Sequence, residues 1–198
     1  TWMPHHVDPG ALPYPVIVKP RFGSSSQNVF RAENEIQLRF FVDYVPQAII
    51  QEFLPGPEIT NDVVCDFDGR LLSVVSRERI RVHGGEVLIG KTIFDSGVSE
   101  DCARIAQALP ALGPITVQCM MNGETHLFTE INARFGGGVP LSIAAGADSP
   151  KWLLASLAGI DMETPAIGEY QVGLHLSRFH DSMFIDNGTV DSFGSDYL

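Results

Sequence analysis

Basic residues, cysteines and long apolar runs are all scarce in this chain of 198 residues. Thirteen lysines and arginines stand against 24 aspartates and glutamates, so the net charge of −11 argues against the basic stripe that nucleic-acid binding requires. No apolar run approaches the length that spans a bilayer, and the first residues lack the basic and apolar blocks of a signal peptide. These shortages argue against nucleic-acid and membrane partners and favour a cytoplasmic protein.

The three cysteines, Cys65, Cys102 and Cys119, are scattered in apolar surroundings and predict buried free thiols in a reducing compartment. No cluster of histidine and cysteine has zinc spacing, and no Gly-x-Ser-x-Gly elbow provides a serine nucleophile. The chain is 44% hydrophobic and 19% charged, which is typical of a globular protein of one domain or two small lobes.

The most informative stretch, residues 127–138, carries Glu130, Asn132 and Arg134 two positions apart. If this stretch is a strand, the three side chains leave one face of the sheet, and the residues between them point into a core. A carboxylate, an amide oxygen and a guanidinium on one face suit a hard divalent cation and the phosphates that it carries.

Gln118, on the preceding strand of a predicted hairpin, can join this set in only one register. A tight two-residue turn would pair Gln118 with Leu127 and turn it to the other face, whereas a wider loop centred on Glu124 would pair it with Glu130. We therefore predict the wider loop. The alternative for Gln118 alone is an ordinary, half-exposed strand glutamine.

Lys19 follows an apolar strand and precedes a flexible loop that contains Gly23 and three serines. Backbone N–H groups and hydroxyls in such a loop can surround phosphate oxygens, and a lysine supplies a point charge beside them. The strict P-loop pattern is absent, because no Gly-Lys-Ser/Thr follows Gly23. The alternative is a solvated turn beside a surface lysine.

Arg77, Arg79 and Arg81 alternate, so they share one face of a predicted strand. Three like charges on one face need anions. Those anions are either a substrate carboxylate or phosphate, or acids on the neighbouring strand such as Glu58 and Asp62. Both interpretations remain open.

Hydrophobic periodicity predicts an α+β protein with mainly antiparallel strands. The clearest helix spans residues 33–45, and its apolar face is formed by Ile36, Phe40, Phe41 and Tyr44. A second helix is predicted at residues 100–112 with Ser99 as its cap.

The break at Pro55-Gly56-Pro57 divides the chain. We expect an entry segment at residues 1–13, a small lobe at 14–54 and a large lobe at 55–198.

Taken in order, these pieces resemble the ATP-grasp superfamily, and most closely its carbamoyl-phosphate synthase large-subunit-like branch. The resemblance covers about residues 14–160 and rests on Pro15-Val16-Ile17-Val18-Lys19-Pro20, the loop Gly23-Ser24-Ser25-Ser26, Ile50-Gln51-Glu52-Phe53-Leu54-x-Gly56-x-Glu58, Val117-Gln118 and Phe128-Thr129-Glu130-Ile131-Asn132-x-Arg134. It implies two α+β lobes with mainly antiparallel sheets that grip ATP between them.

The resemblance also implies roles for single residues. The positions that match nucleotide contacts are Lys19, Gly23, Ser24, Ser25 and Ser26 at the phosphates, Glu52, Phe53 and Leu54 at the adenine, and Glu58 at the ribose. The positions that match magnesium ligands are Gln118, Glu130 and Asn132, with Mn²⁺ as a possible substitute. Arg134 matches the contact to the phosphates or the acyl phosphate. To these we add Arg77 and Arg79 as candidates for holding the substrate carboxylate, and Lys91 for the phosphates.

The implied chemistry is ATP-dependent C–N ligation. A substrate carboxylate attacks the γ-phosphate to give an acyl phosphate and ADP, and an amine then displaces the phosphate. The alternatives are a nucleotide-binding module or fragment without independent turnover, and a phosphotransferase with the same grip. Because family members carry a domain before the lysine strand, we expect an excised portion that lacks its N-terminal domain, or a homodimer.

Overall fold

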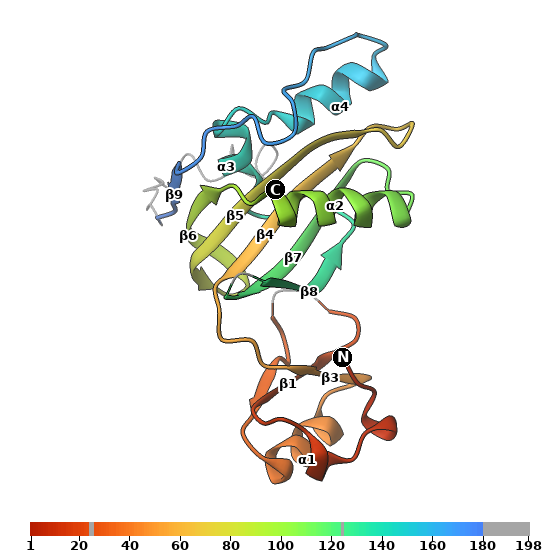
Figure 1. Ribbon diagram of the computed structural model, residues 1–198, viewed down its shortest axis with the longest axis vertical. Helices are drawn as coiled ribbons and strands as arrows, with labels where there is room; N and C mark the ends of the chain where they lie inside the picture. Colours follow the sequence, from red (N-terminus) through yellow and green to blue (C-terminus); the bar gives the residue numbers. More distant parts are fainter. Residues whose placement is uncertain (24–25, 124, 180–198) are drawn as a thin grey trace, which may run out of the picture.

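The computed structural model describes residues 1–23, 26–123 and 125–179, which contain two separate antiparallel sheets (Figure 1). The three-stranded sheet has the order β2-β1-β3 and contains Val16–Pro20 (β1), Phe30–Ala32 (β2) and Ala48–Glu52 (β3). The six-stranded sheet has the order β8-β7-β4-β5-β6-β9 and contains Glu58–Cys65 (β4), Leu71–His83 (β5), Glu86–Ile93 (β6), Pro114–Asn122 (β7), Thr125–Asn132 (β8) and His175–Ser177 (β9). The α-helices are Glu35–Tyr44 (α1), Ser96–Ala108 (α2), Val139–Ala144 (α3) and Ser149–Leu157 (α4). The predicted α+β class with mainly antiparallel strands is confirmed.

The side chains of β1 alternate between an apolar and a polar face of the small sheet. Val16 and Val18 are fully buried, so the alternation of the strand turns Lys19 to the opposite face, away from this core. Residues 1–13 form two short 3₁₀ helices, Pro4–His6 and Pro9–Ala11, and pack on the same sheet. The predicted lobe boundaries stay a prediction.

The predicted apolar face of α1 was wrong for three of its four residues, whereas Phe41 packs against the core of the small sheet as predicted. Ile36, Phe40 and Tyr44 are exposed by 81%, 64% and 60%, whereas Leu38 is buried against the small sheet. Asn34 caps the helix by accepting a hydrogen bond from the Gln37 backbone N–H. Apolar residues occupy two neighbouring stripes of this helix, and periodicity alone does not decide which stripe is buried.

Helix α2 covers one face of the six-stranded sheet, and α4 lies at the end of the sheet far from the small sheet (Figure 1). The core under α2 contains Val63, Val74 and Val117, all less than 1% exposed. The helix begins at Ser96 and is capped by Asp95, which accepts from the Val98 backbone N–H, so the predicted cap at Ser99 was wrong.

The register of the β7–β8 hairpin matches the prediction, although its loop does not. Gln118 pairs with Glu130, as expected. The loop is tight, however, because Asn122 already pairs with Thr125. A β-bulge leaves Thr129 out of the ladder and restores the predicted pairing beyond it.

Among the described residues, no helix is long and apolar enough to cross a membrane. The cysteines Cys65, Cys102 and Cys119 are free and buried, as predicted.

Candidate functional site

Gln118, Glu130 and Asn132 meet on the face of the six-stranded sheet opposite α2. The Asn132 Nδ2 donates to Glu130 Oε1 at 2.7 Å and to Gln118 Oε1 at 3.3 Å. The bulge at Thr129 creates this arrangement, because strict alternation from Phe128 would have turned Glu130 toward α2. The intervening Ile131 is 43% exposed, so the expectation that the residues between the polar ones point into a core was wrong there.

Glu58 on β4 extends this set toward β5. Its Oε1 accepts hydrogen bonds from Gln118 Nε2 and from Arg79 Nη1, each at 2.5 Å. The second terminal nitrogen of Arg79 donates to the Gly85 carbonyl at 2.8 Å. Arg79 therefore pairs with an acid of the neighbouring strand, the second of the two alternatives considered for the arginine face.

Lys19 connects the small sheet to the same site. Its Nζ lies 3.4 Å from the Thr129 carbonyl oxygen and 3.9 Å from Glu130 Oε2, and its side chain is only 15% exposed. Six side chains thus form a continuous series across both sheets, which we call the polar row: Lys19, Glu130, Asn132, Gln118, Glu58 and Arg79.

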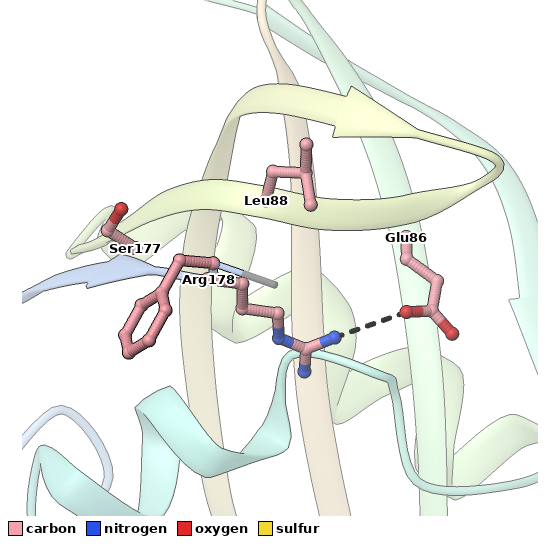
Figure 2. Close-up of a pocket in the computed structure, with 5 residues that line it drawn as sticks. Glu86, Leu88, Ser177 and Arg178 are labelled. Atoms are coloured by element: carbon pink, nitrogen blue, oxygen red, sulfur yellow. Dashed lines mark hydrogen bonds and ion pairs between the residues drawn. The ribbon is translucent and has the colours of Figure 1, made fainter. Parts of the chain in front are cut away.

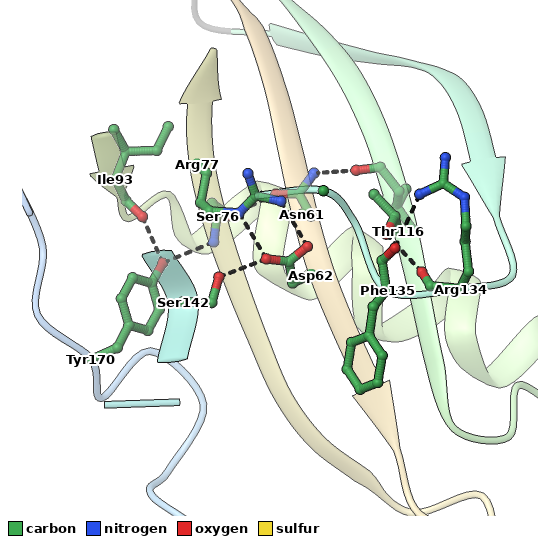
Figure 3. A network of polar contacts seen from close by, with 12 residues as sticks. Asn61, Asp62, Ser76, Arg77, Ile93, Thr116, Arg134, Phe135, Ser142 and Tyr170 are labelled. Carbon is green, nitrogen blue, oxygen red and sulfur yellow. Dashed lines mark hydrogen bonds and ion pairs between the residues drawn. The ribbon is translucent and has the colours of Figure 1, made fainter. Parts of the chain in front are cut away.

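Arg77 faces the same side but is enclosed. It is 2% exposed and binds Asp62 through two hydrogen bonds, Nε to Oδ2 at 2.7 Å and Nη2 to Oδ1 at 2.8 Å (Figure 3). While it is paired in this way its guanidinium cannot reach a substrate. The role of Arg77 in holding the substrate carboxylate therefore does not fit this structure, and the alternative of pairing with Asp62 does.

Residues 53–57 connect β3 to β4, and this segment between the sheets packs against β7. A Cβ on Gly56 would lie 1.6 Å from the Met121 carbonyl oxygen, and the Met121 N–H donates to the Pro57 carbonyl at 3.0 Å. The predicted adenine residues Glu52, Phe53 and Leu54 immediately precede this contact and are partly or largely exposed.

The remaining predicted residues are spread out. Arg134 is exposed and donates from Nη1 to the Phe135 carbonyl at 3.0 Å. Lys91 pairs with Glu78 at 3.3 Å, and the register places both on the face opposite the polar row. In the phosphate loop Gly23 and Ser26 are exposed, while the predicted Ser24 and Ser25 lie outside the described residues.

A separate open cavity of about 440 Å³ lies at the edge of the six-stranded sheet (Figure 2). Its lining residues are Glu86, Leu88, Ser177, Arg178 and Phe179. Arg178 pairs with Glu86 at 3.3 Å and also donates to the Gly137 carbonyl. Arg178 was not predicted from the sequence, because it follows a strand of three residues and belongs to no charge pattern.

The donor chemistry of the polar row fits a hard divalent cation. Glu130 offers a carboxylate, and Gln118 and Asn132 offer amide oxygens, which are the ligand types that Mg²⁺ accepts. In the described part of the chain, no three His, Cys, Asp or Glu side chains gather closely enough to hold a metal. A cation here would therefore depend on one carboxylate, two amides and ligands from outside the chain.

Comparison with known proteins identifies a family and relatives for this chain. The family model described as "ATP-grasp in the biosynthetic pathway with Ter operon" matches residues 44–181. The carbamoyl phosphate synthase large chain of Agathobacter rectalis is 28% identical over 141 residues, which cover 64% of this chain and 13% of that one. This chain therefore spans only a small part of its curated relative.

Two solved structures share the fold. The biotin carboxylase domain of the Hydrogenobacter thermophilus 2-oxoglutarate carboxylase, in complex with MgADP, ADP and bicarbonate, gives a TM-score of 0.66 at 16% identity over 82% of this chain and 40% of that one. The L-amino acid ligase from Bacillus licheniformis gives 0.56 at 22% identity over 76% of this chain and 40% of that one. The family match over most of the chain shows that the chain belongs to the ATP-grasp family, and among curated proteins it is similar to carbamoyl phosphate synthase large chains.

Proposed function

We propose that this chain is the Mg-ATP-binding domain of a carboxylate–amine ligase, which activates a carboxylate as an acyl phosphate for attack by an amine. The observation that carries the proposal is the polar row, which joins a lysine of one sheet to a carboxylate–amide cluster of the other. The likeness to an L-amino acid ligase supports this class of reaction.

Glu130, Gln118 and Asn132 would hold magnesium, which would offset the negative charge of the phosphates. Lys19 adds a positive charge from the opposite sheet. Both hydrogen bonds that the described residues make to the Glu58 side chain are at Oε1, so Oε2 is the atom that we assign to the ribose hydroxyls.

Arg134 becomes the leading candidate for the acyl phosphate and the substrate carboxylate. Arg77 is enclosed, and Arg79 is bound to Glu58 and Gly85. Arg134 is exposed and follows the strand that carries the cation ligands, so its guanidinium is available for a bidentate contact to an anion.

A second candidate function is a nucleotide-binding module without independent turnover. The observation that favours it is that Arg77 and Arg79, the residues predicted to hold the substrate carboxylate, are both paired within the chain. Substrate-dependent ADP release, tested with a panel of carboxylic acids and amines, separates the two functions. An amide product supports the ligase, whereas a stable phosphorylated product indicates a phosphotransferase.

The cation site is tested by the double substitution Glu130→Ala and Asn132→Ala. At a concentration 100-fold above Kd, Mg-ATP should stabilise the wild type by about 2.7 kcal/mol, a rise in Tm of about 5–11 °C. We expect the double variant to lose at least about tenfold in Mg-ATP affinity, or about 1.4 kcal/mol, in a calorimetric titration. Glu100→Ala, which removes an exposed carboxylate from α2, is the control. Unchanged affinity in the double variant would refute the metal assignment, and no Mg-ATP binding by the wild type would refute the proposed function.

A further inference from the structure

A buried ion pair lies directly beneath the segment that carries Arg134. Arg77 on β5 and Asp62 on β4 are 2% and 4% exposed and share two hydrogen bonds of 2.7 Å and 2.8 Å. Ser142 of α3 donates to Asp62 Oδ2 at 2.6 Å, so three elements meet at one carboxylate (Figure 3).

Two glycines of the segment that carries Arg134 lie against this ion pair. A Cβ on Gly138 would be 1.9 Å from Arg77 Nη1, and a Cβ on Gly136 would be 2.9 Å from Asp62 Oδ1. Neither glycine has a positive φ, so it is the close approach to the ion pair that requires glycine here, and not the backbone conformation.

The same segment is also held by neighbouring hydrogen bonds. The Arg134 carbonyl accepts from Thr116 Oγ1 at 2.8 Å, and the Gly137 carbonyl accepts from Arg178. The carbonyls of Gly136 and Gly138 accept from the first N–H groups of the turn into α3, both at 3.0 Å. The course of residues 134–138 is thus set by contacts on several sides, among which the ion pair contributes the close steric contact at Gly136 and Gly138.

A buried ion pair adds little net stability over well-packed apolar side chains, because removing two charges from water offsets most of their attraction. Such a pair does provide a fixed geometry, because a planar guanidinium that makes two hydrogen bonds to a carboxylate is held in one orientation. A lysine in place of Arg77 would keep the charge but would lose this orientation.

We propose that Arg77, paired with Asp62, is a positioning residue that fixes the course of residues 134–138 and thereby the place of the Arg134 side chain. The part of this inference that concerns Arg134 rests on the proposed function. The part in which the Arg77–Asp62 pair supports the backbone of residues 134–138 does not.

The first test measures the backbone segment without any nucleotide. Amide hydrogen exchange is followed in peptides covering residues 133–141 and 114–122, for Arg77→Lys and for the uncharged pair Asp62→Asn/Arg77→Gln. The uncharged pair leaves no unpaired buried charge, so it keeps the test valid if Arg77→Lys does not fold. We expect exchange in 133–141 to accelerate at least about tenfold, while 114–122 stays unchanged. Unchanged exchange, or equal acceleration in both peptides, would overturn the proposal.

The matched control is Arg70→Lys. Arg70 also pairs with an aspartate between β4 and β5, at 3.1 Å from Asp66, but it lies at the turn away from the glycines. This variant should leave both peptides unchanged.

The second test measures Mg-ATP affinity by calorimetry in Arg77→Lys, Arg134→Ala and the double variant. If Arg77 acts through Arg134, Arg77→Lys weakens binding by about fivefold and the double variant is no weaker than Arg134→Ala alone. Losses that multiply, or no loss in Arg77→Lys, would overturn the link to Arg134. If the wild type does not bind Mg-ATP, the proposed function fails, and the exchange measurement still decides whether Arg77 supports the segment.

Discussion

Replacing Gly56, in the segment between the sheets, with alanine should destabilise the protein. The new Cβ would lie 1.6 Å from the Met121 carbonyl oxygen and 2.7 Å from its carbonyl carbon. Both are backbone atoms, so no rotamer change can relieve the overlap. The segment or the end of β7 has to move by about 2 Å to reach an ordinary contact distance.

The magnitude follows from what that movement disturbs. Overpacking against a rigid neighbour costs about 1–3 kcal/mol. The adjacent hydrogen bond from the Met121 N–H to the Pro57 carbonyl, 3.0 Å long, adds about 1 kcal/mol if it breaks. The sum is about 2–4 kcal/mol, equivalent to a decrease in Tm of about 4–16 °C for a domain of this size.

Thermal and urea unfolding of Gly56→Ala measure this loss. Gly137→Ala is the matched control, because its Cβ would meet no atom within 4 Å and its φ is not positive. The control should stay within about 0.5 kcal/mol of the wild type. If Gly56→Ala is equally stable, then the segment between the sheets does not rest on β7, and the reasoning is refuted.

Two further predictions concern titratable groups. Burial raises the pKa of Cys102 to about 12 and that of Cys119 to about 11, so about one thiol in a thousand or fewer is ionised at pH 8. We therefore expect iodoacetamide to label neither thiol until the protein is unfolded, as mass spectrometry of native and denatured samples would show; rapid native labelling would contradict this. The pKa of Asp101 lies below its ordinary value because its carboxylate is bonded to the His126 ring, 2.7 Å away, and lies near Arg104. A lowered folded-state pKa stabilises the protein above the unfolded value of about 3.9, and this contribution is lost as the pH falls through the folded pKa. Asp101→Asn should accordingly lower the urea midpoint at pH 7 and have much less effect at about pH 3, and equal effects at both pH values would exclude this explanation.

Sequence patterns predicted the polar cluster well because its members interact along and across neighbouring strands. The two-residue spacing placed Glu130 and Asn132 together, and the requirement for a common face gave the Gln118–Glu130 pair. The loop that achieves this pairing was wrong, because a bulge within a strand and a longer loop have the same effect on register, and hydrophobic alternation does not distinguish them.

Burial was harder to predict than proximity. The sequence indicated that the arginines of β5 need anions, and it named both Asp62 and a substrate as candidates. Only the packing of Gly136 and Gly138 over Arg77 decides between them, and that contact joins parts of the chain about 60 residues apart. The exposure of Ile36 on α1 was missed for a related reason, since two apolar stripes compete and tertiary contacts select one.

The bulge at Thr129 also determines how the two sheets meet. A residue outside the ladder has a carbonyl group that points away from the usual inter-strand direction, and here that carbonyl lies 3.4 Å from Lys19 Nζ. One extra residue therefore both rotates Glu130 onto the polar face and supplies a backbone oxygen that contacts the lysine of the other sheet. Deleting Thr129 should disturb both at once: the carboxylate would turn toward α2, and Lys19 would lose its contact with β8. For this reason a single-residue gap at this position in a related chain would change which side chains face the proposed cation site, even where the counterparts of Gln118, Glu130 and Asn132 are retained.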